Sequence, residues 1–152
     1  MSTIKVDTYL TRGGASEIAI DKLKGASSAA SISVVAEGGS TTTNLQQGLA
    51  KNWIKFNQVS GNSVRDSFNL SSLTDIAAAQ AGINFTNSFA NDDYAMTGTG
   101  SNTYSNGYSK DIVMLEDQTN STSLSNVCIK YGGAANGEDR NHISVVHHGD
   151  LA

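Results

Sequence analysis

The sequence has little of several features that would point to a particular class of protein. Its 152 residues include no proline, one cysteine and three histidines, and 10 Lys and Arg stand against 14 Asp and Glu. A net charge of −4 without a basic cluster argues against a surface that binds nucleic-acid phosphates. No apolar run approaches the roughly 20 residues that cross a bilayer, and the polar N-terminus lacks the apolar core of a signal peptide. We therefore expect neither nucleic-acid binding nor membrane insertion.

Apolar side chains are also scarce. They make up 38% of the chain, below the ~45–50% that is typical of globular domains. We expect contacts between subunits to supply part of the missing burial. A single cysteine, Cys128, excludes an internal disulfide, and its apolar neighbours Val127 and Ile129 favour a small buried side chain over a reactive thiol.

What the chain has instead is many Ser, Thr and Asn residues and 15 glycines. This composition favours short strands and tight turns over long helices. About seven or eight strand patterns separated by such turns predict an all-β fold, an antiparallel β-sandwich of jelly-roll-like type. We place it in residues 44–152, after an extended N-terminal arm in residues 1–43. The later strand patterns lie at residues 83–85, 94–96, 112–115, 127–131 and 143–147.

The clearest strand pattern lies in residues 51–70, which hold the only tryptophan. In an extended strand Trp53 and Ile54 point to opposite faces. A polar break with Gly61-Asn62 predicts a turn, and a second strand returns with these residues on one face: Val64, Asp66, Phe68 and Leu70. Trp53 is either a core tryptophan or the anchor of a subunit interface.

Four stretches then follow one another along the chain: residues 51–57 (KNWIKFN), 64–75 (VRDSFNLSSLTD), 83–89 (INFTNSF) and 93–95 (DYA). Over residues 1–95 the chain resembles the short tail-fibre-type virion proteins of marine tailed bacteriophages. The resemblance implies a structural or binding role and supplies no catalytic residues. It departs from the family at His147-His148-Gly149-Asp150, where an apolar or aromatic residue usually precedes Gly-Asp.

The leading interpretation is a structural protein located in the virion. It would be a tail-fibre or appendage-type subunit, a homo-oligomer and most simply a homotrimer, in contact with other virion proteins. One alternative is a capsid decoration protein on the phage head. A second is a carbohydrate-binding β-sandwich module. We expect no enzymatic activity and no cofactor.

Residues 1–43 have two interpretations. The Gly, Ser and Thr content of residues 25–43 is typical of a flexible linker. Strand-like pairs of apolar residues, Ile4 with Val6 and Ile18 with Ile20, instead favour an anchoring arm that lies extended on a neighbouring subunit. We favour the arm, because true linkers rarely carry repeated alternating apolar pairs.

The sequence allows two short helical turns, of which the first is short or absent because Gly48 lies inside it. One follows Asn44, whose side chain can cap a turn beginning at Leu45. The other lies in residues 74–80, where Ala77, Ala78 and Ala79 follow one another, although the family resemblance implies a strand connection there.

The loop of residues 98–109 holds the candidate ligand contacts. Tyr104 and Tyr108 flank Asn106-Gly107, the strongest signal for a two-residue turn. Aromatic and amide groups together are the chemistry with which exposed loops bind sugars. Tyr104, Asn106 and Tyr108 are therefore candidate contacts for a host-surface glycan, unless the tyrosines only cover the end of the sandwich.

The three histidines, His142, His147 and His148, all lie in the last eleven residues. In a strand His142 and His148 share one face and His147 takes the other, so at most two can meet at one metal ion. We expect solvent or interface positions and predict no metal site.

Overall fold

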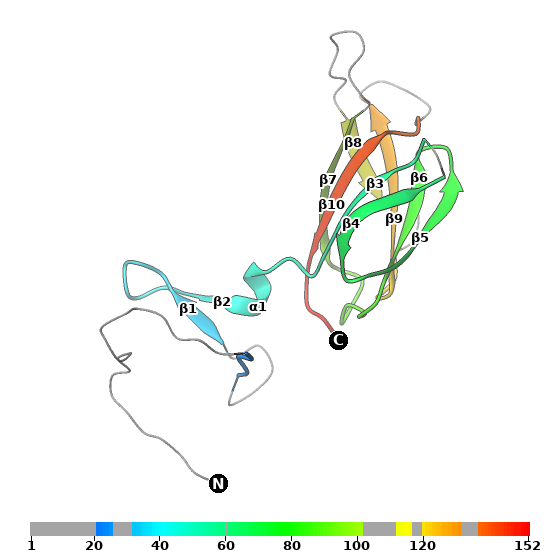
Figure 1. The fold of residues 1–152 in the computed structure, drawn as a ribbon. Coiled ribbons are helices and arrows are strands. Elements are labelled where there is room, and N and C mark those ends of the chain that lie inside the picture. Colours follow the sequence, from blue (N-terminus) through cyan, green and yellow to red (C-terminus); the bar gives the residue numbers. More distant parts are fainter. Residues whose placement is uncertain (1–20, 26–31, 60, 102–111, 117–119, 132–136) are drawn as a thin grey trace.

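The computed structural model describes residues 21–25, 32–59, 61–101, 112–116, 120–131 and 137–152 (Figure 1). Over these residues strands are the main element, the helix is a single short turn, and every strand pair is antiparallel, so the predicted all-β antiparallel class is confirmed. The elements are β1 (Ser33–Val35), β2 (Thr42–Asn44), α1 (Leu45–Gly48), β3 (Asn52–Asn57), β4 (Ser63–Phe68), β5 (Leu70–Ala77), β6 (Gln80–Phe85), β7 (Ala95–Ser101), β8 (Ile112–Glu116), β9 (Leu124–Tyr131) and β10 (His142–His148).

Eight of the strands form two four-stranded sheets (Figure 1). The first, here called the β3 sheet, has the order β4-β3-β10-β7, and the second, the β6 sheet, has the order β5-β6-β9-β8. Strands that follow each other in sequence pair as β3–β4, β5–β6 and β8–β9. The last strand, β10, returns to lie between β3 and β7. The β3 sheet is therefore completed only by the end of the chain.

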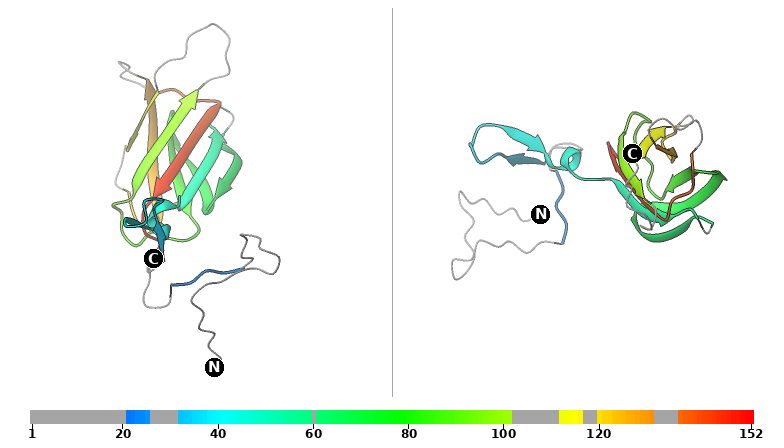
Figure 2. Two further views of the ribbon diagram at one scale, coloured as in Figure 1. Left: turned by 90° about the vertical axis from the view of Figure 1, so that its left-hand side faces the viewer. Right: turned by 90° about the horizontal axis from the view of Figure 1, so that it is seen from above.

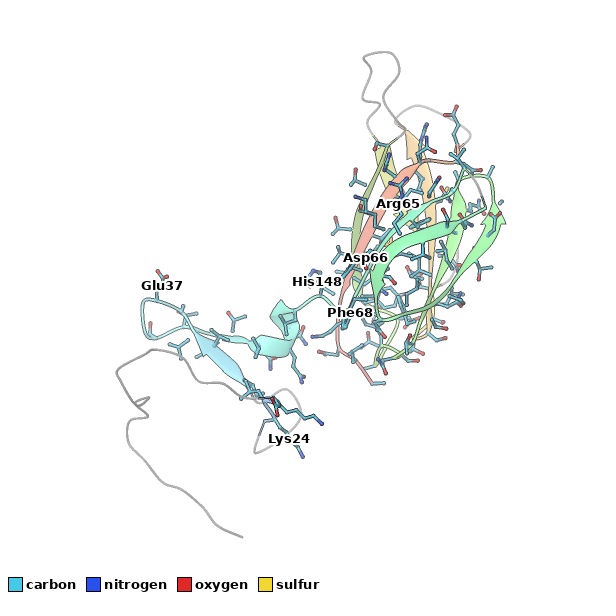
Figure 3. The ribbon with its side chains drawn as sticks, in the orientation of Figure 1. Lys24, Glu37, Arg65, Asp66, Phe68 and His148 are labelled. Carbon is cyan, nitrogen blue, oxygen red and sulfur yellow. The ribbon has the colours of Figure 1, made fainter. Side chains whose placement is uncertain are left out.

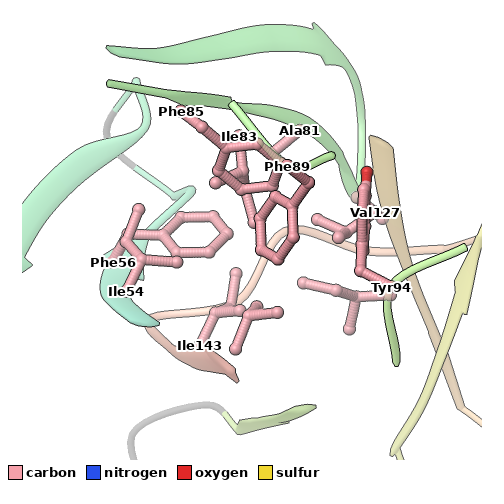
Figure 4. Close-up of a cluster of buried hydrophobic side chains, with 12 residues drawn as sticks. Ile54, Phe56, Ala81, Ile83, Phe85, Phe89, Tyr94, Val127 and Ile143 are labelled. Carbon is pink, nitrogen blue, oxygen red and sulfur yellow. The ribbon is translucent and has the colours of Figure 1, made fainter. Parts of the chain in front are cut away.

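The core draws side chains from both sheets and from the loop between β6 and β7 (Figure 4). The period of two explains which residues enter it. Along β3, Ile54 and Phe56 are buried while Trp53 and Lys55 face outward, and β10 alternates in the same way. The buried cluster consists of Ile54, Phe56, Ala79, Ala81, Ile83, Phe85, Phe89, Tyr94, Val127, Ile129, Ile143 and Val145. Cys128 is buried, as predicted.

Asn69 forms the corner at which the chain leaves the β3 sheet and enters the β6 sheet. Its φ of 58° is left-handed, a conformation that asparagine tolerates better than most residues. Its Nδ2 donates to the carbonyls of Lys51 at 2.9 Å and Asn87 at 3.0 Å, and its Oδ1 accepts the Asn87 N–H at 2.7 Å. The corner corrects the predicted hairpin, because Leu70 begins β5 in the other sheet and does not continue β4.

Replacing Asn69 tests this corner. We expect Asn69→Ala to lower the free energy of unfolding by about 2 kcal/mol, because it loses the hydrogen bonds and forces alanine into a left-handed conformation. Asn69→Gly loses the same bonds without the conformational cost, so it should be less destabilised than Asn69→Ala by about 1 kcal/mol. Urea unfolding of both variants measures this difference. Equal losses in the two variants would show that the left-handed corner costs alanine nothing.

The described residues before β3 include a small hairpin and one helical turn. β1 and β2 pair from Ser33 with Asn44 to Val35 with Thr42. The Oδ1 of Asn44 accepts the N–H groups of Gln46 at 2.8 Å and Gln47 at 3.2 Å, so the predicted cap is confirmed. None of residues 21–25 and 32–50 is buried, and burial begins at Lys51.

Two other predictions about elements were wrong. Residues 74–77 continue strand β5 instead of starting a helical turn, because Ala81 and Gly82 on β6 pair with Asp75 and Thr74. The predicted loop of residues 98–109 begins later than expected, since β7 extends to Ser101. In the part of the chain that the structure describes, no helix is long and apolar enough to cross a membrane.

Candidate functional site

The outer face of the β3 sheet carries an apolar row that crosses its strands. Strand register places Phe68 of β4 opposite Trp53 of β3, and Trp53 opposite Val146 of β10. Trp53 is 36% exposed and Phe68 is 51% exposed. Side chains that oppose each other across antiparallel strands lie about 4.5–5.5 Å apart at Cβ, so these three form a continuous stripe. We call Phe68, Trp53 and Val146 the aromatic row.

A charged row runs beside the aromatic row on the same face. Asp66 lies opposite Lys55, and Lys55 lies opposite Ser144 of β10. A register shift next to Lys55 makes room for an extra residue, Arg65, on β4. Figure 3 shows Arg65, Asp66 and Phe68 in succession along β4. Oppositely charged groups and exposed aromatic rings therefore lie within one small patch.

Arg65 is held in place across the face of the sheet. Its Nη1 lies 2.9 Å from Nδ1 of His142, and its Nη2 donates to the carbonyl of Asn141 at 3.0 Å. A guanidinium can only donate, so Nδ1 of His142 is the acceptor in this contact. The other N–H groups of Arg65 keep the capacity to bind a carboxylate, and the guanidinium is already oriented.

The structure places the predicted site residues unequally. Trp53 lies on the outer face, which excludes the core interpretation and leaves the predicted interface role open. Tyr104, Asn106 and Tyr108 lie outside the described residues, and so do Ile4, Val6, Ile18 and Ile20. Sequence reasoning missed Arg65 and Phe68 as site residues. The sequence did not give this pairing, because a two-residue turn at Gly61-Asn62 would place Leu70 opposite Trp53. The observed register, with Asn57 opposite Ser63 and a shift next to Lys55, places Phe68 there instead.

A second polar centre lies inside the molecule, around His147. Its Nδ1 lies 3.0 Å from Oδ1 of Asn52 on β3, and its Nε2 lies 3.0 Å from Oγ of Ser125 on β9. The Asn52 amide nitrogen already donates to the carbonyls of Phe68 at 2.9 Å and Asn69 at 3.2 Å, so its oxygen faces the ring. Nδ1 of His147 must then carry the hydrogen, and Nε2 accepts the Ser125 hydroxyl.

This order of serine, histidine and amide resembles the relay of a nucleophilic hydrolase. The side chains of Asn52, Ser125 and His147 are each 0% exposed, however, so a substrate has no route to the serine. The rings of Phe85 and Tyr94 pack edge-on against the imidazole, with centroids 5.2 and 5.4 Å away. The arrangement is a buried polar link that ties β9 of one sheet to β3 and β10 of the other.

Burial sets the protonation state of His147. Loss of solvation, followed by the charge of neighbouring His148, lowers its pKa from 6.5 to about 4. A neutral ring satisfies both hydrogen bonds, whereas an imidazolium would be a buried charge among aromatic rings. His147 is therefore neutral at physiological pH.

The histidines are separated by the alternation of β10. His142 and His148 are half-buried on the outer face and His147 takes the other face, as predicted. The expected solvent or interface position was wrong for His147, because the inner face of β10 is the core side and His147 is buried there. Among the residues that the structure describes, no three His, Cys, Asp or Glu side chains are grouped as ligands for a metal ion.

No protein-family model, no curated protein and no solved structure matches this chain. A functional proposal therefore rests on the sequence resemblance and on two exposed surfaces, the aromatic row and the described residues before β3, 21–25 and 32–50.

Proposed function

We propose that this chain is a structural virion protein of a tailed bacteriophage, a homo-oligomeric tail-fibre or appendage-type subunit that is most simply a trimer. In this proposal residues 1–43 form an extended arm that anchors the subunit, and residues 44–152 form its body. The observation that carries the proposal is that a chain poor in apolar residues leaves large apolar side chains on two surfaces: Leu23, Val34, Val35 and Leu49 before β3, and Trp53 and Phe68 on the β3 sheet.

These exposed side chains are enough to support association. Complete burial of one aliphatic or aromatic side chain contributes about 1.5–3 kcal/mol. Tryptophan at the centre of an interface is among the residues that most often dominate binding. The β1–β2 hairpin also needs a partner, because a lone two-stranded hairpin is marginally stable in water.

We further propose that the body is a β-sandwich of jelly-roll-like type. Eight strands divided four and four, with a shared buried cluster, support this arrangement. Each sheet also pairs strands that are consecutive in sequence, which gives a local hairpin at three places.

A carbohydrate-binding module is the second candidate, and the aromatic row is the observation that favours it. Exposed aromatic faces can stack on sugar rings, while Lys55, Asp66 and Arg65 beside them offer hydrogen bonds to hydroxyl groups. The same row serves a subunit contact equally well. Substituting Trp53 and Phe68 with serine separates the candidates. If the row binds carbohydrate, the variant should no longer be retained on glycans. If the row is a subunit contact, the oligomer should dissociate and its molar mass should fall.

Counting copies of the chain in purified particles tests the virion role. Quantitative mass spectrometry should find on the order of tens of copies if the chain is an appendage arranged with cyclic symmetry. Hundreds of copies spread over the shell would instead favour the capsid decoration alternative. Absence of the chain from purified particles would contradict both virion roles.

Removing residues 1–43 tests the arm. The buried cluster lies entirely within residues 54–145, so the shortened chain should remain soluble and unfold cooperatively. It should no longer join the particle, because the arm supplies the anchoring contacts. Thermal unfolding and particle incorporation are measured together. Incorporation at the normal copy number would show that residues 1–43 are a linker and that the anchor lies in the body.

A further inference from the structure

We propose that the β1–β2 hairpin of one copy docks on the outer face of the β3 sheet of a neighbouring copy. Glu37 at the hairpin tip meets Arg65 of the neighbour, and one of the two hairpin valines, Val34 or Val35, packs on its aromatic row. This inference rests on the proposed homo-oligomer and names the two surfaces that join its subunits.

The β1–β2 hairpin exposes apolar side chains that its own chain does not cover. Val34 and Val35 are 51% and 58% exposed, and because they are adjacent in a strand they point to opposite faces. The hairpin is therefore apolar on both sides. Contact on either face would remove one valine from water, and three residue pairs alone do not hold two strands together.

The chain directs the hairpin away from its own sheets. Figures 1 and 2 show β1 and β2 beside the two sheets, joined to β3 through α1 and residues 49–51. The turn α1 is tied to the body, because the Gln47 amide donates to the Asp150 carboxylate and the Lys51 ammonium donates to the Gln46 carbonyl. With α1 held at the body and the hairpin projecting from it, the surface that receives the hairpin belongs to another copy.

Charge complementarity selects the β3 sheet as that surface. Glu37 is the only charged residue between Ile32 and Ala50. It lies at the turn closed by the hydrogen bond from Ala36 N–H to the Thr41 carbonyl, and Figure 3 shows it at the hairpin tip. The receiving face carries Arg65 and Lys55 against one carboxylate, Asp66, on a chain whose net charge is −4.

The hydrogen bonds of Arg65 support its pairing with Glu37. Its contacts with His142 and Asn141 fix the guanidinium on the surface while leaving N–H groups unused. An arginine already oriented in this way can bind a carboxylate in two-point fashion with little loss of side-chain freedom. Trp53 and Phe68 lie on the same face, so one hairpin can contact both the charged and the aromatic row.

The two surfaces are different, so each copy gives a hairpin and receives one. Such a head-to-tail contact closes into a ring when the rotation between copies allows it. A closed ring docks every hairpin and covers every aromatic row, and a ring of three is the form that matches the proposed trimer.

Charge reversal in the full chain tests the contact. Glu37→Arg alone and Arg65→Glu alone should each lower the association constant at least about tenfold, because each places like charges together. The double variant restores the opposite pair and should return to within about threefold of the natural chain. Sedimentation velocity over a concentration series measures association. Asp75→Arg on β5, an exposed carboxylate with the same charge change, is the matched control and should leave association unchanged.

Thermal unfolding shows whether each variant is folded. If Arg65→Glu disturbs β4, the test rests on Glu37→Gln and Glu37→Arg, because Glu37 is in an exposed turn. Glu37→Gln should weaken association, and Glu37→Arg should weaken it more. If the molar mass of the oligomer is the same in Glu37→Gln, Glu37→Arg and Arg65→Glu as in the natural chain, the inference is overturned and the proposed function stands. Failure of the double variant to recover would also overturn it. A natural chain that is monomeric throughout would contradict the proposed function itself.

Discussion

Replacing His147 with alanine is expected to lower the free energy of unfolding by about 3–5 kcal/mol. The change leaves a cavity among the rings of Phe85, Phe89 and Tyr94. It also leaves the Asn52 oxygen and the Ser125 hydroxyl without the partner that each has at 3.0 Å. Both costs arise at a site that is 0% exposed, so water cannot replace the lost contacts.

Urea unfolding at pH 7.5 measures this loss. His148→Ala is the matched control, because His148 is the next residue on the same strand but lies half-buried on the outer face. We expect the control to change stability by less than about 1 kcal/mol. Similar losses in the two variants would contradict the proposed role of His147 as the link between the sheets.

Acidification is expected to remove about 3 kcal/mol of stability through the same residue. The pKa of His147 is 6.5 in the unfolded chain and about 4 in the folded protein. Between these values the unfolded state binds more protons, so stability falls as the pH falls, by at most about 1.4 kcal/mol per pH unit. Well above pH 6.5 the ring is neutral in both states and adds no pH dependence.

Other groups titrate in this range, so the comparison needs a variant without the imidazole. His147→Gln keeps hydrogen-bonding capacity at the site and cannot be protonated. Urea unfolding of both proteins at several pH values between 7.5 and 4 should give a difference in stability that shrinks as the pH falls through 6.5. Parallel pH profiles would show that His147 titrates in the folded protein as it does in the unfolded chain.

Local alternation predicted the strands well where strands are regular. The period of two in β3 and β10 sorted the residues onto the two faces correctly, including His147 from its neighbours, without showing which face was the core. It failed at Asn69, where one left-handed residue moves Leu70 into another sheet. It also failed at residues 74–77, because a run of alanines favours a helix until pairing with β6 overrides that preference.

The partners of His147 could not be predicted from local alternation, because they are distant in sequence. Asn52 and Ser125 lie 95 and 22 residues away in sequence, and only the completed pairing of the two sheets brings them to the ring. The β1–β2 hairpin was not predicted either, since Ser, Thr and Gly between its strands are typical of a linker. For Trp53 the pattern gave the alternation but not which face was the core.

The molar mass of the full-length chain in solution tests the central claim most directly. Light scattering on a chromatographic peak at micromolar concentration should give about 48 kDa, three times the 15.9 kDa of one chain. A stable mass near 15.9 kDa at every concentration would contradict the account, because the exposed valines and aromatic side chains would then have no second copy to cover them.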